Sequence, residues 1–369
     1  MAEACHRMVE VGEHIATAET PPGAAYLDPS VFQVELETIF SRAWLGLVPV
    51  AMPAGSAHPF DLLPGALDES LVMNADGNGF RRVLSNVCTH RGMKVVTATG
   101  PTRALRCGYH GRRFGVDGRL EAAPGFEGAQ EFPRPCDDLS SAGLAAWGPA
   151  SFVRLLPGMP FADWIGPARE WFDFLPLDVL AHDPSGDRRF VVSANWKLYL
   201  DNYLEGFHIP TVHKSLASAL DLSAYRTELL PHGSMQIGVA SKEPVLPIGS
   251  THPLCGESIG ALYLHLFPNT LFNVYPWGVS LNLVNPVTPT TTEVLFHRYV
   301  WKPELVDQGA GADLDRVEAE DEAVVEATQR GLRSRLYQRG RYSPRHEAAV
   351  HHFHRWWSTQ LAGSHGTNQ

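Results

Sequence analysis

Two short segments that each combine a cysteine with a histidine restrict the local fold more than any other feature of the chain. The first is "CTHRG", Cys88 to Gly92, and the second is "CGYHGRRF", Cys107 to Phe114, with sixteen residues between the first histidine and the second cysteine. A glycine follows each pair closely and permits a tight backbone turn. The spacing predicts two adjacent loops in a small β-module, which together present four donor side chains: Cys88, His90, Cys107 and His110.

Such a donor set has three ordinary explanations: a structural zinc site, an iron–sulfur site, or coincidence. In common Cys2His2 zinc sites one element supplies both cysteines and the other supplies both histidines. Here each segment supplies one of each. This favours a [2Fe–2S] cluster with two cysteines on one iron and two histidines on the other. Neutral imidazoles in place of thiolates raise the reduction potential, so such a cluster accepts an electron readily.

The composition is that of a soluble globular protein, and its charge narrows the choice of partners. Of 369 residues, 44% are hydrophobic and 19% are charged, and the length suggests two domains. The 30 basic and 40 acidic residues give a formal charge of −10, which argues against nucleic acid or an anionic membrane as partner. The first twenty residues lack the apolar core of a signal peptide. Sparse cysteines, Cys5 among them, favour a reducing cytoplasm.

Local patterns divide the chain into three parts. Residues 1–44 contain an amphipathic helix from Pro29 to Trp44, which we expect to pack on the C-terminal domain. Residues 45–155 carry short apolar runs broken by Gly, Pro and Asp, which predict a small all-β domain. Residues 156–369 combine strand-like runs with a helix near Asn195 to His208 and another from about Asp313 to Leu336. The predicted class is therefore α+β.

A second group of candidate ligands occurs in "NWKLYLDNYLEGFHIPTVH", residues 195–213. In a helix beginning after Asn195, Asp201, Glu205 and His208 share one face. Pro210 would break that helix and let His213 return to the same point. Two histidines need one carboxylate to make a non-haem Fe(II) site with open positions for dioxygen and substrate.

The best candidate for that carboxylate is Asp321, in "DLDRVEAEDEAVVEATQRGL". It is the charged member of a mostly apolar helical stripe that also contains Val317, Val324, Thr328 and Leu332. A metal would offset the cost of burying an unpaired carboxylate there, although a partly exposed Asp bonded to an Arg is the alternative. The neighbouring acids are expected on a solvated face: Glu318, Glu320 and Glu322.

Together these motifs resemble the α subunits of Rieske non-haem iron oxygenases over nearly the whole chain. The matching features are the two Cys/His segments, then Asn-Trp-Lys, then Glu-x-x-His-x-x-x-x-His, then an Asp before "QRGL". Two departures are Gly108, where many members have Pro, and Arg112, where many have Trp. The resemblance implies a small all-β Rieske domain, a helix-grip catalytic domain with a curved antiparallel sheet, and head-to-tail trimers. It makes His208, His213 and Asp321 the ligands of a mononuclear iron.

The same resemblance assigns further roles. Asp201 and Glu205 become candidate catalytic residues, with Glu205 bridging to a cluster histidine, His110, of a neighbouring subunit. Most members have Asp where this chain has Glu205. The Glu makes the chain similar to the branch that acts on choline, carnitine and other quaternary ammonium compounds. A flavin-containing NAD(P)H reductase, with or without a ferredoxin, would supply electrons for oxidation of a small organic substrate by dioxygen. The chain itself has no G-x-G-x-x-G segment.

Two alternatives remain open from the sequence: an aromatic ring-hydroxylating dioxygenase α subunit, and a Rieske electron carrier whose large half binds partners. Aromatic residues on the predicted strands are candidates for a pocket that binds a quaternary ammonium through cation–π contacts. They are Tyr263, Phe267, Phe272, Tyr275 and Trp277. The histidine-rich segment 346–357 is expected to be an amphipathic helix that packs Val350, Phe353 and Trp357.

Overall fold

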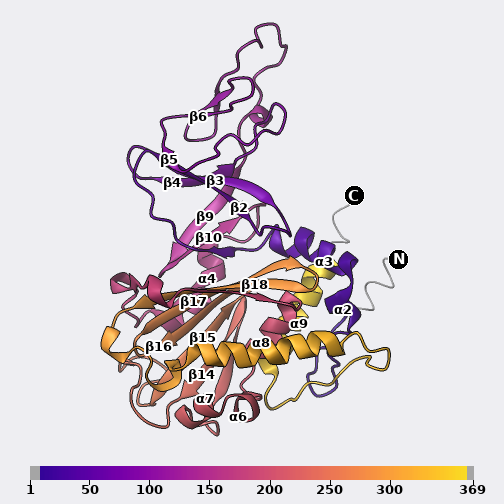
Figure 1. Ribbon diagram of the computed structural model, residues 1–369, viewed down its shortest axis with the longest axis vertical. Helices are drawn as coiled ribbons and strands as arrows, with labels where there is room; N and C mark the ends of the chain where they lie inside the picture. Colours follow the sequence, from indigo (N-terminus) through magenta and orange to yellow (C-terminus); the bar gives the residue numbers. More distant parts are fainter. Residues whose placement is uncertain (1–8, 364–369) are drawn as a thin grey trace. The chain divides into compact units, whose positions relative to one another are not determined.

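The computed structural model describes residues 9–363, so Cys5 lies outside the described residues (Figure 1). The chain divides into two compact units. One is Trp44–Gly158, and the other joins the chain up to Ala43 with the chain from Met159 onward. No described helix has the length and apolar character needed to cross a membrane.

The smaller unit is built from short antiparallel strands. Its main sheet has the order β1-β10-β9-β4-β3-β2-β5. A second, three-stranded sheet has the order β6-β7-β8. The strands are β1 Leu45–Leu47, β2 Ser56–Leu62, β3 Glu69–Ala75, β4 Arg81–Ser85, β5 Gly100–Pro101, β6 Leu105–Arg106, β7 Arg113–Phe114, β8 Leu120–Ala122, β9 Ser141–Trp147 and β10 Ala150–Arg154. The predicted all-β character of this segment is confirmed.

The larger unit is organised around one curved antiparallel sheet of eight strands (Figure 1). The order is β11-β18-β17-β16-β15-β14-β13, and β12 also pairs with β18. The strands are β11 Ala181–His182, β12 Arg188–Val192, β13 Arg226–Leu230, β14 Gly233–Val239, β15 Ile259–Leu266, β16 Thr270–Tyr275, β17 Gly278–Thr288 and β18 Thr291–Val300. Every residue of β16 is buried, so both faces of the central sheet are covered. The predicted α+β class is confirmed.

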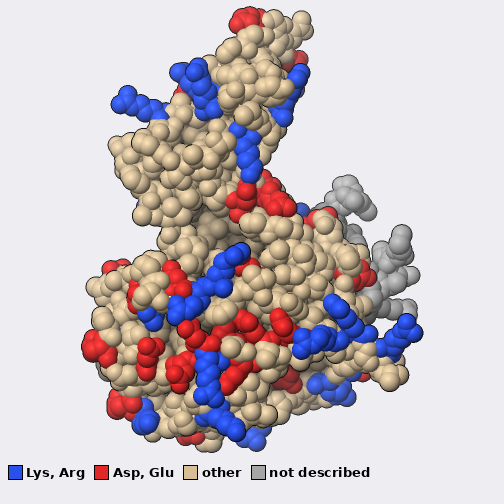
Figure 2. Space-filling model, viewed as in Figure 1, with Lys and Arg blue, Asp and Glu red and all other residues tan. Residues whose placement is uncertain are grey.

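Helices cover this sheet and position the candidate ligands. In Figure 1, α8 runs across the sheet, and Figure 2 shows acidic and basic side chains interspersed over the face of the molecule that it draws. The helices are α2 Ala24–Leu27, α3 Pro29–Glu35, α4 Phe161–Phe172, α5 Trp196–Tyr203, α6 Ile209–Val212, α7 Lys214–Ala219, α8 Leu314–Gly331 and α9 Ala348–Ala362. Val350, Phe353 and Trp357 of α9 are buried, which confirms the predicted packing of that segment.

A buried ion pair joins the N-terminal segment to α5 and α9. Glu35 and Lys197 are both fully buried and form a salt bridge. The same carboxylate accepts hydrogen bonds from the indole N–H groups of Trp196, at 2.9 Å, and Trp357, at 2.7 Å. Asn195 caps α5 by accepting from the Lys197 amide at 3.0 Å. The Asn-Trp-Lys motif therefore starts α5 and anchors it to two other helices.

Replacing Glu35 with Ala is expected to lower the free energy of unfolding by about 3–5 kcal/mol, because Lys197 would stay buried without a counter-charge. Urea denaturation followed by tryptophan fluorescence measures the change. Glu37→Ala is the matched control, since Glu37 is exposed on the next turn, and it should change stability by less than about 0.5 kcal/mol. Equal stability of the two variants would contradict the importance of this ion pair.

Three predicted helices end earlier than expected. The Pro29–Trp44 helix becomes a π-helical turn, η1 Leu36–Phe40, and stops at Phe40. The helix predicted to reach His208 stops at Tyr203, because the Glu205 carboxylate accepts from the amides of Phe207 and His208 and replaces the helical acceptors. The helix predicted to reach Leu336 stops at Gly331.

Candidate functional site

The smaller unit brings the four sequence-predicted cluster ligands together. Cys88 and Cys107 are each 2% exposed. The rings of His90 and His110 lie edge to face with centroids 4.6 Å apart. The structure thus places the two thiols side by side in the core and the two imidazoles beside each other.

Matching turns create this arrangement. Gly92 and Gly111 have φ angles of +74° and +76°, a conformation that L side chains rarely adopt. The Gly92 amide donates to the Cys88 carbonyl at 2.9 Å, and the Gly111 amide donates to the Cys107 carbonyl at 3.1 Å. The two loops therefore have the same backbone conformation, as expected for a pair of ligand loops.

The donor chemistry fits a [2Fe–2S] cluster with mixed ligands. Desolvation, and then the neighbouring His110 and Arg112, lower the pKa of His90, which favours the neutral imidazole that binds metal. Its Nδ1 is buried and has no hydrogen-bond partner. Burial raises the pKa of the Cys88 thiol, and contact with Cys107 adds to the rise. Two metal ions would remove these costs by binding both thiolates and both imidazoles.

Arg112, one of the two departures from the family pattern, connects the two loops. Its side chain is 3% exposed and donates to Thr89 Oγ1 at 3.0 Å. Its guanidinium lies over the rings of Phe126, at 4.6 Å, and Phe132, at 5.2 Å. Asp137 lies 3.7 Å away and supplies the counter-charge. The departure therefore changes the packing around the loops and leaves their ligands in place.

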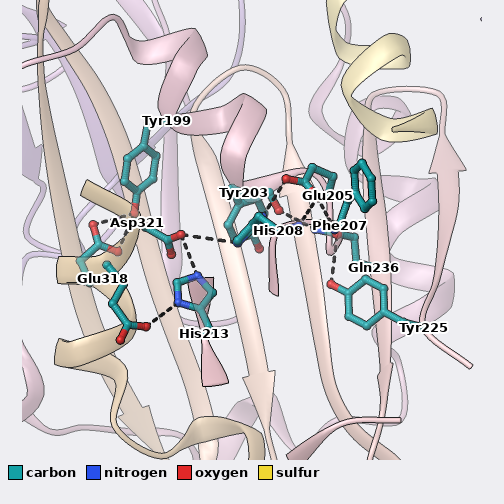
Figure 3. A network of polar contacts seen from close by, with 11 residues as sticks. Tyr199, Tyr203, Glu205, Phe207, His208, His213, Tyr225, Gln236, Glu318 and Asp321 are labelled. Atoms are coloured by element: carbon teal, nitrogen blue, oxygen red, sulfur yellow. Dashed lines mark hydrogen bonds and ion pairs between the residues drawn. The ribbon is translucent and has the colours of Figure 1, made fainter. Parts of the chain in front are cut away.

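In the larger unit, His208, His213 and Asp321 converge on one point (Figure 3). Asp321 Oδ1 lies 2.9 Å from His213 Nε2 and 3.5 Å from His208 Nε2. One ligand atom from each of the three residues lies within 4.8 Å of the others. His213 is 1% exposed and Asp321 16%. Two neutral nitrogens and one carboxylate oxygen in this arrangement suit a non-haem iron and leave coordination positions open.

Two further carboxylates hold the outer ring nitrogens of these histidines. Glu205 Oε1 lies 2.7 Å from His208 Nδ1, and Glu320 Oε2 lies 2.8 Å from His213 Nδ1. Burial lowers the pKa of His213, but the bonds to Asp321 and Glu320 outweigh it and raise that pKa overall. Each carboxylate fixes the tautomer in which Nδ1 carries the proton and Nε2 is free to bind a metal.

The predicted solvated face of α8 is wrong for Glu318 and Glu320, and Glu322 is only partly exposed, with its Oε1 buried. Glu320 contacts His213, and Glu318 is 6% exposed, with both carboxylate oxygens within 3.0 Å of the Tyr199 hydroxyl. The buried face of α8 is made by Glu318, Val325 and Gln329. A search for apolar residues at helical spacing misses this face, because two of its buried residues are polar and are held by hydrogen bonds. These three residues are spaced i, i+7 and i+11, and that helical spacing is the sequence signal that could have identified the face.

Asp201 is not directed at the candidate iron ligands. It accepts from the Tyr26 hydroxyl at 2.9 Å and lies 2.8 Å from His354 Nε2. The early end of α5 at Tyr203 removes the common helical face that the sequence predicted for Asp201, Glu205 and His208. Asp201 therefore connects α5, on which it lies, to α2 through Tyr26 and to α9 through His354.

A cavity lies against the three converging ligands, and only two of the predicted aromatic residues line it. Tyr263 and Tyr275 do so. Phe267 packs against Phe353 of α9 at 5.6 Å. Phe272 faces away, since its neighbour Asn273 lines the cavity and strand side chains alternate. Trp277 stacks behind Tyr275 at 5.1 Å and lines an adjacent pocket.

Sequence reasoning missed several groups that do line the cavity. Aromatic rings come from α5, the loop before β13, and β18. Polar amides and hydroxyls come from β14, β16 and β17. These residues are Tyr199, Tyr203, Tyr225, Phe296, Gln236, Asn273, Ser280 and Asn282. They are far apart in the sequence, so no short motif predicts that they line one cavity.

Comparison with known proteins identifies the class that this fold and site define. Residues 179–363 match the family described as "Ring hydroxylating alpha subunit (catalytic domain)", and residues 54–133 match "Rieske [2Fe-2S] domain". The chain belongs to the Rieske non-haem iron oxygenase α subunits. It therefore binds a Rieske [2Fe–2S] cluster and a mononuclear iron, and it is an oxidoreductase.

Individual relatives narrow the comparison. The chain is 31% identical to choline monooxygenase of Arabidopsis thaliana, over 91% of this chain and 82% of that protein. It is 28% identical to the carnitine monooxygenase oxygenase subunit of Acinetobacter baumannii, over 87% of each. Among solved structures, the quaternary ammonium Rieske monooxygenase CntA with L-carnitine has a TM-score of 0.73 at 22% identity, covering 93% of this chain and 96% of that one. Naphthalene 1,2-dioxygenase from Rhodococcus sp. has a TM-score of 0.70 at 20% identity, covering 93% of this chain and 94% of that one.

Proposed function

We propose that this chain is a terminal oxygenase that oxidises a small quaternary ammonium compound without a carboxylate group, of which choline is the simplest example. The observation that carries the proposal is the lining of the cavity. Five tyrosine rings line it, and among the described residues no Lys or Arg does. Such a cavity suits a cation and offers no charged partner to an anion.

The tyrosines provide neutral ring faces. Burial raises the pKa of all five, so they remain uncharged phenols at neutral pH. Tyr203 donates to Asn273 Oδ1 at 2.7 Å, and Tyr225 donates to Gln236 Oε1 at 3.0 Å, which fixes both rings. Each ring face that a trimethylammonium group contacts contributes about 0.5–2 kcal/mol.

Glu318 supplies the counter-charge in this proposal. It lines the cavity, and burial, followed by the charge of Asp321, raises its pKa well above the usual carboxyl range. Its negative charge is therefore costly until a cation shares the cavity. A zwitterion such as carnitine would add a second carboxylate with no basic side chain to receive it.

For the chemistry, we assign the cluster to Cys88, His90, Cys107 and His110, and the mononuclear iron to His208, His213 and Asp321. When bound, these centres supply the electrons and the activation of dioxygen. The protein residues hold the substrate and control protons. Glu205 and Glu320 keep a proton on Nδ1 of each iron histidine, and the tyrosine rings exclude water from the ammonium group.

In this proposal Glu205 also connects two subunits of a head-to-tail homotrimer. A solved structure of a quaternary ammonium Rieske monooxygenase reveals insights into inter-subunit electron transfer in that protein. Here Glu205 lies beside Phe207, an aromatic ring that is 53% exposed, and His110 lies beside Tyr109, which is 56% exposed. Exposed rings next to both groups suit an interface in which His110 of one subunit donates to Glu205 of the next. A flavin-containing NAD(P)H reductase, with or without a ferredoxin, would reduce the cluster in the cytoplasm.

A single-turnover assay tests the substrate without the native reductase. The cluster is reduced chemically and then exposed to dioxygen together with choline, carnitine, glycine betaine or naphthalene. Choline should accelerate reoxidation of the cluster and yield an oxidised product detected by mass spectrometry. Acceleration by naphthalene and by no ammonium compound would overturn the proposal.

Glu318→Gln should raise KM for choline by about tenfold, because a charge interaction of about 1.4 kcal/mol is lost while the Tyr199 hydrogen bond is kept. The matched control is Glu322→Gln on the same helix, because Glu322 does not line the cavity. A KM unchanged by Glu318→Gln would show that the tyrosines bind the cation alone.

A further inference from the structure

A second cluster of two histidines and one aspartate occurs in the larger unit, in addition to the candidate iron site. Its members are His182 in β11, Asp187 just before β12, and His297 in β18. They meet because β11 and β12 both pair with β18, and the intervening turn, η4 Pro184–Gly186, returns the chain to the same strand. We propose that these three residues bind a zinc-class divalent cation.

The distances match those of a metal site. Asp187 Oδ2 lies 2.9 Å from His182 Nε2 and 3.2 Å from His297 Nδ1. One ligand atom from each of the three residues lies within 4.8 Å of the others. Ligands that bond zinc tetrahedrally at about 2.0–2.1 Å lie roughly 3.3 Å apart. The donor set is the same as that of His208, His213 and Asp321.

The hydrogen bonding of His297 points to an absent partner. Its side chain is 13% exposed and both ring nitrogens are buried: Nε2 has no hydrogen-bond partner, and Nδ1 lies 3.2 Å from Asp187 Oδ2 without the geometry of a hydrogen bond. A buried polar atom left unpaired costs free energy, so buried imidazoles normally have a partner for at least one nitrogen. Nδ1 is the nitrogen nearer to Asp187, and a cation between them would satisfy it.

Asp187 is oriented for this role by the backbone. Its Oδ1 accepts from the Arg298 amide at 3.2 Å and lies 3.1 Å from His182 Nε2, while its Oδ2 faces both histidines. The Arg298 guanidinium is paired with Asp183, at 2.7 Å, and does not neutralise Asp187. Imidazole nitrogen with carboxylate oxygen favours zinc, copper or nickel over magnesium or calcium.

The site is separate from the catalytic cavity. Phe296, the residue before His297 in β18, lines that cavity, so alternation along the strand places His297 on the opposite face of the sheet. His182 is 41% and Asp187 28% exposed, which leaves one side open to solvent for a water ligand. A cation here would clamp the two-residue strand β11 to β18 and would exchange with free metal.

Equilibrium dialysis of the iron-replete holoenzyme against zinc sulfate tests the proposal. We expect about one zinc per chain to bind with no iron released, and a higher melting temperature. His182→Gln and Asp187→Asn should each weaken zinc binding at least tenfold. Asp178→Asn, at an exposed residue of the same segment, should not, and magnesium should not bind.

His182 is partly exposed, so its variant is expected to fold, and circular dichroism of both variants verifies this. Zinc uptake that occurs only with loss of iron would place the cation in the catalytic site and overturn the proposal. Equal zinc affinity in wild type, His182→Gln and Asp187→Asn would also overturn it.

Discussion

Asp321→Ala is expected to remove about one iron per chain and all turnover, while the Rieske spectrum stays unchanged. Asp321 is the carboxylate that contacts both His208 and His213, and its Oδ1 faces both Nε2 atoms. Two imidazoles alone do not complete the facial set of ligands that non-haem Fe(II) requires. The expected loss is therefore of the metal itself, measured as iron per chain by plasma emission spectrometry.

A neighbouring acid on α8 supplies the control for this experiment. Glu322→Ala removes a carboxylate one residue away that makes no contact with either histidine in the described structure. It should keep full iron content and turnover. If Asp321→Ala also kept both, the carboxylate ligand would have to be another residue, and Glu318 and Glu320 would be the next to test.

Glu205→Gln is expected to keep both metal centres and yet lower turnover by about 10–100-fold. The carboxylate accepts from His208 Nδ1 and from two backbone amides. An amide group accepts through only one oxygen and so cannot hold His208 and also receive His110 of a neighbouring subunit. Glu205→Asp keeps the charge with a shorter arm and should give an intermediate rate.

Glu320→Gln separates electron transfer from simple positioning of a ligand. Glu320 holds His213 in the same way that Glu205 holds His208. Stopped-flow reoxidation of the reduced cluster, with dioxygen and substrate present, should slow strongly for Glu205→Gln and little for Glu320→Gln. Equal rates in the two variants would exclude Glu205 as the electron route.

The parts of the site that the sequence predicts well are those set by short spacing. Cys88 and His90 sit in one tight turn, and Cys107 and His110 sit in another, so local geometry alone brings each pair together. The meeting of His208 and His213 also follows from a short segment, although the chain achieves it by ending α5 at Tyr203 and not by a break at Pro210.

Other features depend on contacts between distant segments, which a single sequence does not reveal. Glu318 is buried because Tyr199 of another helix reaches its carboxylate. Phe267 appeared to be a pocket residue but packs on α9. The tyrosines of the cavity come from α5, the loop before β13, β15 and β16, which are far apart in the sequence and meet only in the folded chain.

Anomalous diffraction from crystals of the iron-replete enzyme at the iron absorption edge tests the central claim most directly. The account predicts three iron peaks per chain, two between Cys88, Cys107, His90 and His110 and one bonded to His208, His213 and Asp321. A single-iron peak elsewhere, or only the pair of peaks, would contradict the assignment of the catalytic centre.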